Sequence, residues 1–309
     1  MRGPSARQPL RNELSWSKSR ESKLRECARQ YYFHYYASWG GWERNAPPET
    51  RELYILKKLT SRAAWAGTTV HDAIAHALSL VRDGIQPDRE RLVAQCRARM
   101  RAEFRESREK AYRRRKAFGL VEHEYDEAIE DAQWKANWEL VERCLVAFFE
   151  SRWLQLARAL PKERWLPIDE LASFHFEGTK IFAAPDFAFR TEEGGAVLVD
   201  WKTGQKRDAD KEQLLGYAMF AHRSWDVPLD RIACRVVYLP SLDEIEVPVD
   251  EAEVESFSGR MRDSIARMRD LLIDPEQNVA AIASFPKTAD PGACARCPFR
   301  GPCGGVEAA

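Results

Sequence analysis

The stretch PDFAFRTEEGGAVLVDWK, residues 185–202, decides how this chain is interpreted. We expect residues 180–189 to form a strand with Asp186 near its end. A turn at Gly194-Gly195 follows, and then a short apolar strand over 196–199 that Asp200 ends. The ends of adjacent strands lie close in space, so the two carboxylates can share one cation. Residues i and i+2 of a strand point to the same face, so Lys202 is expected to share that site.

These residue types suit phosphodiester chemistry. Two carboxylates can hold a hard divalent cation such as Mg²⁺ through oxygen, and the backbone carbonyl of Trp201 could add another oxygen. A lysine beside them can neutralise phosphate charge or help to make hydroxide from bound water. Asp-x-Lys is common, however, so two turn acids and an ordinary surface lysine are the alternative for Asp186, Asp200 and Lys202.

Composition sets the class of protein. The chain has 309 residues, 44% hydrophobic and 31% charged, which is typical of a soluble globular protein with one large domain or two modest ones. No apolar stretch approaches the roughly 20 residues that span a bilayer, and the first residues lack the apolar core of a secretory signal. We therefore expect a cytoplasmic protein without membrane association. In that compartment structural disulfides among the seven cysteines are not expected.

Charge leaves the question of a nucleic-acid partner open. The 48 basic and 48 acidic residues cancel, which is mild evidence against such a partner. Residues 97–116 nevertheless carry ten Arg or Lys against three Glu. This run is either a solvated helix face with Glu–Arg pairs or a contact to the DNA backbone. The candidate DNA contacts are Arg113, Arg114, Arg115 and Lys116.

Periodicity predicts an α/β fold, with a small mixed central sheet flanked by helices and a helical insertion at about 88–162. A disordered tail is expected over 1–14, and a single domain over 15–309. Besides the hairpin, the expected helices are 15–36, 61–82, 88–117, 122–160, 208–223 and 250–273, and the expected strands are 168–176, 232–239 and 244–249. Residues 40–48 are expected to form a loop, and the Gly-, Pro- and Cys-rich residues 291–305 no regular structure.

Three further patterns accompany the hairpin. Glu170 is expected to begin the strand before Asp186. Upstream lies Gly67-x-x-x-His71, and downstream lies Gln213-x-x-x-Tyr217, whose two side chains share a helix face. Each alone has an ordinary structural explanation.

In this order, the patterns resemble the PD-(D/E)XK nuclease superfamily and its RecB-like branch. The resemblance implies a restriction-endonuclease-like core and a divalent-metal-dependent DNA nuclease. It also implies a site that holds Mg²⁺ or Mn²⁺. The metal ligands would be His71, Asp186, Asp200 and the Trp201 carbonyl, and the catalytic group would comprise Asp186, Asp200, Lys202, Glu170, Gln213 and Tyr217.

The cysteines fall into two groups. Cys96, Cys144 and Cys234 sit in apolar or helical segments and are interpreted as buried small hydrophobes. Cys294, Cys297 and Cys303 form a C-x₂-C-x₅-C run without an apolar pattern around it, and are interpreted as metal ligands that need a fourth thiolate.

The context of Cys27 resembles the early cysteine of Fe–S-containing RecB-family nucleases, such as the CRISPR-associated exonucleases and the AddB nuclease domain. Ala28 replaces the proline that usually follows that cysteine. The resemblance implies a [4Fe–4S] cluster on Cys27, Cys294, Cys297 and Cys303 that clasps the two ends of the chain. Structural zinc and no metal remain the alternatives.

The function implied is hydrolysis of DNA, with exonuclease action on single strands or DNA ends as the family tendency. A helicase or a CRISPR or repair protein is compatible as a partner. One alternative is a catalytically silent Fe–S module that binds DNA or acts as a scaffold in a repair or CRISPR-type complex. Another is a zinc-clasped helical interaction protein with a chance Asp-x-Lys. The sequence has no Walker-type phosphate loop, so the chain is not itself a helicase.

Overall fold

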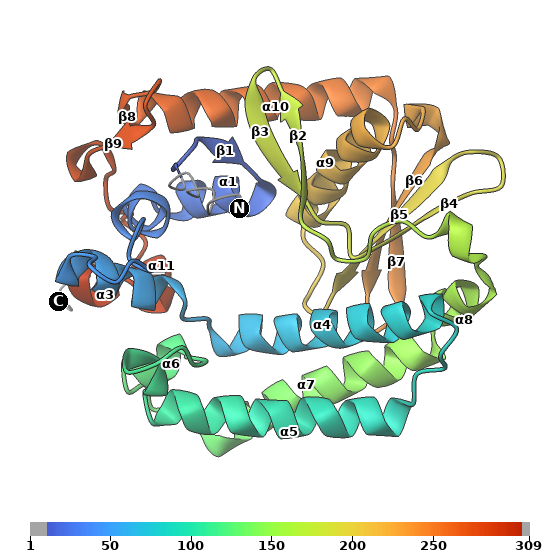
Figure 1. The fold of residues 1–309 in the computed structure, drawn as a ribbon, viewed down its shortest axis with the longest axis horizontal. Coiled ribbons are helices and arrows are strands. Elements are labelled where there is room, and N and C mark those ends of the chain that lie inside the picture. Colours follow the sequence, from blue (N-terminus) through green and yellow to red (C-terminus); the bar gives the residue numbers. More distant parts are fainter. Residues whose placement is uncertain (1–10, 305–309) are drawn as a thin grey trace, which may run out of the picture.

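The computed structural model describes residues 11–304, and Figure 1 shows a mixed sheet between two layers of helices. Its strands lie in the order β4-β5-β6-β7, and only the β5–β6 pair is parallel. Helix α9, Asp208–Ser224, forms the crossover between those two parallel strands and packs on them. The strands are β4 (Phe187–Arg190), β5 (Ala196–Lys202), β6 (Ile232–Tyr238) and β7 (Asp243–Val247).

The side chains of β5 alternate between the two helical layers. Leu198 packs with Leu214 of α9, on the side that α10 (Glu251–Asp270) also covers. Val199 and Trp201 pack instead with residues of α4 (Arg62–Arg82), α7 (Asp131–Glu150) and α8 (Arg152–Ala159). This alternation turns Asp200 and Lys202 toward α9.

The predicted helical insertion contains α5, α6, α7 and α8; in Figure 1 α5, α6 and α7 lie below α4, and α8 lies beside the right end of α4. Helix α5 ends at Arg108, and α7 starts at Asp131, so the two long helical patterns are shorter than expected. Cys96, Cys144 and Cys234 are buried, as predicted. Within residues 11–304, no helix is long and apolar enough to cross a membrane. The remaining bounds here are α5 (Arg89–Arg108), η2 (Ala111–Arg113), α6 (Val121–Glu124) and η3 (Lys162–Arg164).

The prediction of one strand over 180–189 was wrong. The chain leaves β3 (Thr179–Ala183) before Pro185 and enters β4 at Phe187, and the two strands belong to different sheets. Pro185 has no N–H to donate to a ladder, which favours a break there. Asp186 therefore precedes β4. Because Phe187 pairs with Val199, Asp186 still lies at the same end of the hairpin as Asp200.

The prediction of a helical stretch over 15–36 was right except at its start and in its continuity. Ser15–Trp16 form β1, which pairs in parallel with β3, and β2 (Ala172–Phe176) completes that sheet. Ser17 then caps α1 by accepting a hydrogen bond from the Arg20 N–H. The helical stretch is divided into α1 (Lys18–Glu26), α2 (Ala28–Tyr32) and the π-helix η1 (Phe33–Ala37).

Short elements occupy segments that we expected to be irregular. Pro48 begins α3 (Pro48–Lys57), because proline suits the first turn of a helix. Asp290 caps α11 (Pro291–Arg296) through the Gly292 N–H, and α12 (Arg300–Cys303) follows. The other short elements are η4 (Leu229–Arg231), β8 (Leu272–Asp274), β9 (Val279–Ala280) and η5 (Ile282–Ser284).

The two ends of the described chain meet. Arg29 of α2 donates from its backbone N–H to the Pro286 carbonyl, 3.0 Å away, and from its side chain to the Phe285 carbonyl, 2.7 Å away. The Asn12 amide donates to the Tyr35 carbonyl, so contacts begin upstream of Ser15. Residues 1–10 of the expected tail lie outside the described residues.

Candidate active site and cysteine pocket

Asp186 is held between the hairpin and α4. One of its oxygens accepts the backbone N–H of Trp201 at 2.7 Å, and the other lies 3.0 Å from Nδ1 of His71. Only 8% of Asp186 is exposed. These two contacts fix the orientation of its carboxylate and bring the predicted helix motif to the hairpin.

His71 carries a positive charge at neutral pH. Burial lowers the pKa of its imidazole, but the attraction of the Asp186 carboxylate outweighs burial and raises the pKa to about 9. A protonated imidazole cannot ligate a metal. His71 must therefore release a proton before it can serve as the predicted ligand.

Asp200 is almost fully buried, with 1% of its surface exposed. Burial first, and the Asp186 charge second, raise the pKa of its carboxyl. Neither of its oxygens has a hydrogen-bond partner within residues 11–304, although Nζ of Lys202 lies 2.7 Å from one of them as an ion pair. A buried carboxylate with Lys202 alone beside its oxygens, next to a second carboxylate, fits a site that a divalent cation would complete.

The predicted Gln-x-x-x-Tyr motif orients Lys202. The ammonium donates to Oε1 of Gln213 at 2.9 Å, and Nε2 of Gln213 lies 2.6 Å from the hydroxyl of Tyr217. Burial lowers the pKa of Lys202, but the Asp200 charge more than compensates and raises it above its ordinary value. Lys202 is therefore a fixed positive charge beside the two carboxylates.

Sequence reasoning missed Asp169. Asp169 and Glu170 are both exposed in the segment before β2, but Asp169 donates its backbone N–H to the Pro185 carbonyl at 3.1 Å. Burial and the Asp186 charge raise the pKa of the Asp169 carboxyl, so it lies within electrostatic reach of the site. Its φ of 46° is in the left-handed region, where aspartate is enriched, and that preference is its only sequence signal.

The four candidate DNA contacts differ in whether a carboxylate of the described chain pairs with them. Arg113 forms an ion pair with Glu52 at 2.7 Å and another with Glu124, and Arg115 pairs with Glu106 at 2.7 Å. Arg114 and Lys116 are exposed. Carboxylates of the chain thus already balance Arg113 and Arg115, as the solvated-face interpretation expects.

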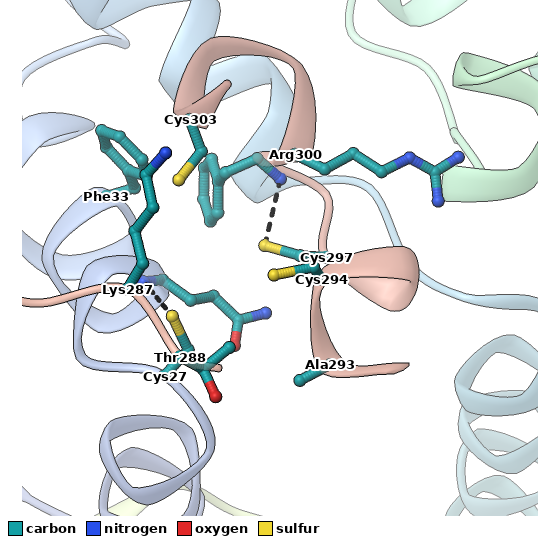
Figure 2. A pocket seen from close by; sticks show the side chains of 11 residues that line it. Cys27, Phe33, Lys287, Thr288, Ala293, Cys294, Cys297, Arg300 and Cys303 are labelled. Atoms are coloured by element: carbon teal, nitrogen blue, oxygen red, sulfur yellow. Dashed lines mark hydrogen bonds between the residues drawn. The ribbon is translucent and has the colours of Figure 1, made fainter. Parts of the chain in front are cut away.

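The four predicted cluster cysteines line one pocket. Figure 2 shows the sulfurs of Cys27, Cys294, Cys297 and Cys303 facing a common space. Two sulfurs accept backbone N–H groups: Cys27 from Gln30 at 3.5 Å and Cys297 from Phe299 at 3.4 Å. Residues far apart in the sequence therefore converge here.

This pocket is not a compact mononuclear site. Tetrahedral zinc would bring four thiolate sulfurs to about 3.8 Å from one another, given a Zn–S bond of roughly 2.3 Å. Among residues 11–304, no group of three or more His, Cys, Asp or Glu side chains is placed to hold a single metal ion. The side chains as described therefore do not form a closed set of metal ligands.

Comparison with known proteins identifies the family of this chain. The family model of the PD-(D/E)XK nuclease superfamily matches residues 15–304, which is nearly all of the described chain. No curated protein matches the chain closely enough for comparison. The chain therefore belongs to the PD-(D/E)XK nuclease superfamily, and this membership implies a metal-dependent nuclease.

Proposed function

We propose that this chain hydrolyses DNA with a divalent cation held by Asp186, Asp200, His71 and the Trp201 carbonyl. The observation that carries the proposal is the buried Asp200 carboxylate, which lies beside a second carboxylate and has Lys202 as its one ion-pair partner within residues 11–304. A Mg²⁺ or Mn²⁺ ion would offset the cost of burying both charges.

The residues divide the chemistry among them. When bound, the cation would supply a Lewis acid and an acidified water. Lys202, fixed by Gln213 and Tyr217, neutralises charge that develops on the phosphate. Asp169 is better placed than Glu170 to support the site, because the Asp186 charge reaches its carboxyl and its backbone N–H is bonded to the Pro185 carbonyl.

The RecB-like resemblance supports a finer proposal about the substrate. We infer exonuclease action on single-stranded DNA or DNA ends, in company with a helicase or a CRISPR or repair protein. The test uses DNA labelled at either end, single- and double-stranded, with Mg²⁺ or Mn²⁺. An exonuclease releases labelled mononucleotides or short products from one end, and the end that is attacked gives the polarity.

The nuclease proposal itself is tested with Asp200→Asn in the same assay. The matched control is Asp72→Asn, because Asp72 follows His71 on α4 but pairs with Arg99. We expect cleavage by the wild type and the control, and none by Asp200→Asn. Metal-independent DNA binding without cleavage by the wild type would instead support a catalytically silent binding module.

We further propose a [4Fe–4S] cluster on Cys27, Cys294, Cys297 and Cys303. Its support is the resemblance to Fe–S-containing nucleases, the shared pocket and the two N–H groups directed at sulfurs. The cluster would add a link between chain ends that Arg29 already joins.

The cluster is tested by measuring iron, acid-labile sulfide and zinc in anaerobically purified protein. Cys297→Ser should lose the iron and sulfide, whereas Cys96→Ala, at a buried cysteine far from this pocket in the sequence, should keep them. Stoichiometric zinc without sulfide, or no metal at all, would reject the cluster.

A further inference from the structure

The helical insertion carries a groove that the nuclease site does not use. It has a volume of about 880 Å³ and lies between α4, α5 and α7. Its lining combines aromatic, basic and apolar side chains. They are Trp65, Arg97, Met100, Arg101, Phe104, Arg105, Trp134, Lys135 and Trp138.

Two rows of side chains face each other across this groove. Arg97, Arg101 and Arg105 recur every four residues on α5, so they form one ridge along the helix. Trp134 and Trp138 have the same spacing on α7 and form the opposite ridge. The guanidinium of Arg97 lies 5.4 Å from the centre of the Trp138 ring, so the ridges meet.

The arginine ridge is uncompensated. Arg97, Arg101 and Arg105 are exposed, and no carboxylate within residues 11–304 forms an ion pair with any of them. By contrast, the next arginine ridge along the chain, Arg113 and Arg115, is paired with glutamates. Three of the basic run's arginines without an ion pair among the described residues therefore lie beside the tryptophans.

The groove is fixed relative to the metal site. Glu103 of α5 accepts the indole N–H of Trp65 at 2.6 Å, and Arg99 pairs with Asp72 at 2.7 Å. Trp65 and His71 lie on the same helix, six residues apart, which is about 9 Å along its axis. The contacts of Trp65 and Asp72, near the two ends of this stretch of α4, hold α5 against α4.

We propose that this groove binds single-stranded DNA outside the catalytic site, with bases stacked on Trp134 and Trp138 and phosphates on the arginine ridge. Flat aromatic faces beside unpaired arginines match a chain of bases and phosphates, and stacking of this kind tolerates any sequence. The choice of DNA rests on the proposed nuclease function. The groove would hold the strand while the metal site acts on another part of it.

The test measures binding of a fluorescent 20-nucleotide oligo-dT by anisotropy in EDTA, where cleavage cannot occur. Trp138→Ala should weaken binding at least five-fold, and Trp138→Phe, which keeps an aromatic ring, should restore most of it. Arg101→Ala should weaken binding and reduce the salt slope by about 0.7. Arg91→Ala, on the same helix but outside the groove, should bind as the wild type does.

Each outcome decides between the two proposals. Unchanged affinity in both Trp138→Ala and Arg101→Ala would overturn the groove proposal and leave the groove to a protein partner. If the groove substitutions weaken oligo-dT binding but the wild type never cleaves DNA, the nuclease proposal is overturned and the groove proposal stands. Asp200→Asn should bind oligo-dT through the groove while cutting nothing.

Discussion

Replacing Gly67 with alanine should separate stability from activity. Gly67 lies on α4 one turn before His71, and a Cβ atom there would meet only Oγ1 of Thr203, 3.5 Å away. That distance is ordinary van der Waals contact. Alanine is favoured over glycine within a helix by about 1 kcal/mol, so Gly67→Ala should unfold about 2 °C higher.

The same methyl group should impair catalysis. Thr203 follows Lys202 directly, so the added group narrows the space between α4 and the end of β5, beside the proposed metal site. A small misplacement of the scissile phosphate is costly, and we expect kcat/KM for DNA cleavage to fall about tenfold or more.

Thermal unfolding in EDTA and single-turnover cleavage with saturating Mn²⁺ measure the two effects. Gly259→Ala is the matched control, because Gly259 lies inside α10 and its added Cβ would meet nothing within 4 Å. The control should gain the same stability and keep full activity. Full activity of Gly67→Ala, or a loss of its stability, would refute the reasoning.

The remaining predictions concern the metal site and its ion pairs. In EDTA the protein should lose up to about 3 kcal/mol of its free energy of unfolding between pH 6.5 and 9.5. The pKa of His71 is about 9 in the folded chain and 6.5 in the unfolded chain. The stabilisation by protonated His71 is therefore complete below pH 6.5 and is lost as the pH rises through 9. Urea unfolding checks this, and His71→Asn should flatten the profile. Mn²⁺ at 100 times its Kd should stabilise the wild type by about 2.7 kcal/mol and Asp200→Asn far less. Equal stabilisation of both would place the ion elsewhere. Gln213→Ala should reduce kcat more than it raises KM, because Lys202 loses its acceptor; an unchanged kcat would remove Gln213 from the site.

The sequence was sufficient to predict the hairpin, because turn residues and apolar runs are local signals. It also predicted that His71, Gln213 and Tyr217 share a site with the carboxylates. In the structure His71 contacts Asp186, Gln213 accepts a hydrogen bond from Lys202, and Tyr217 contacts Gln213. Spacing along a helix decides which side chains share a face, so this can be predicted from the sequence without knowledge of tertiary contacts.

Features that depend on distant packing were beyond sequence reasoning. Asp169 reaches the site only because its backbone N–H meets the Pro185 carbonyl across the break between β3 and β4. The basic run shows the same limit. Arg113 meets Glu52, which is 61 residues away, whereas Arg101 meets no acid within the described chain. Local pattern does not reveal which arginines remain free to bind a phosphate.

The most direct test of the central claim compares Mn²⁺ binding with DNA cleavage in the wild type and Lys202→Ala. Lys202 lies beside the carboxylates but is not a proposed metal ligand. The account predicts that calorimetry detects bound Mn²⁺ in both proteins, while labelled DNA is cut by the wild type and not by the variant. Metal-dependent cutting by Lys202→Ala at the wild-type rate would contradict the proposed site.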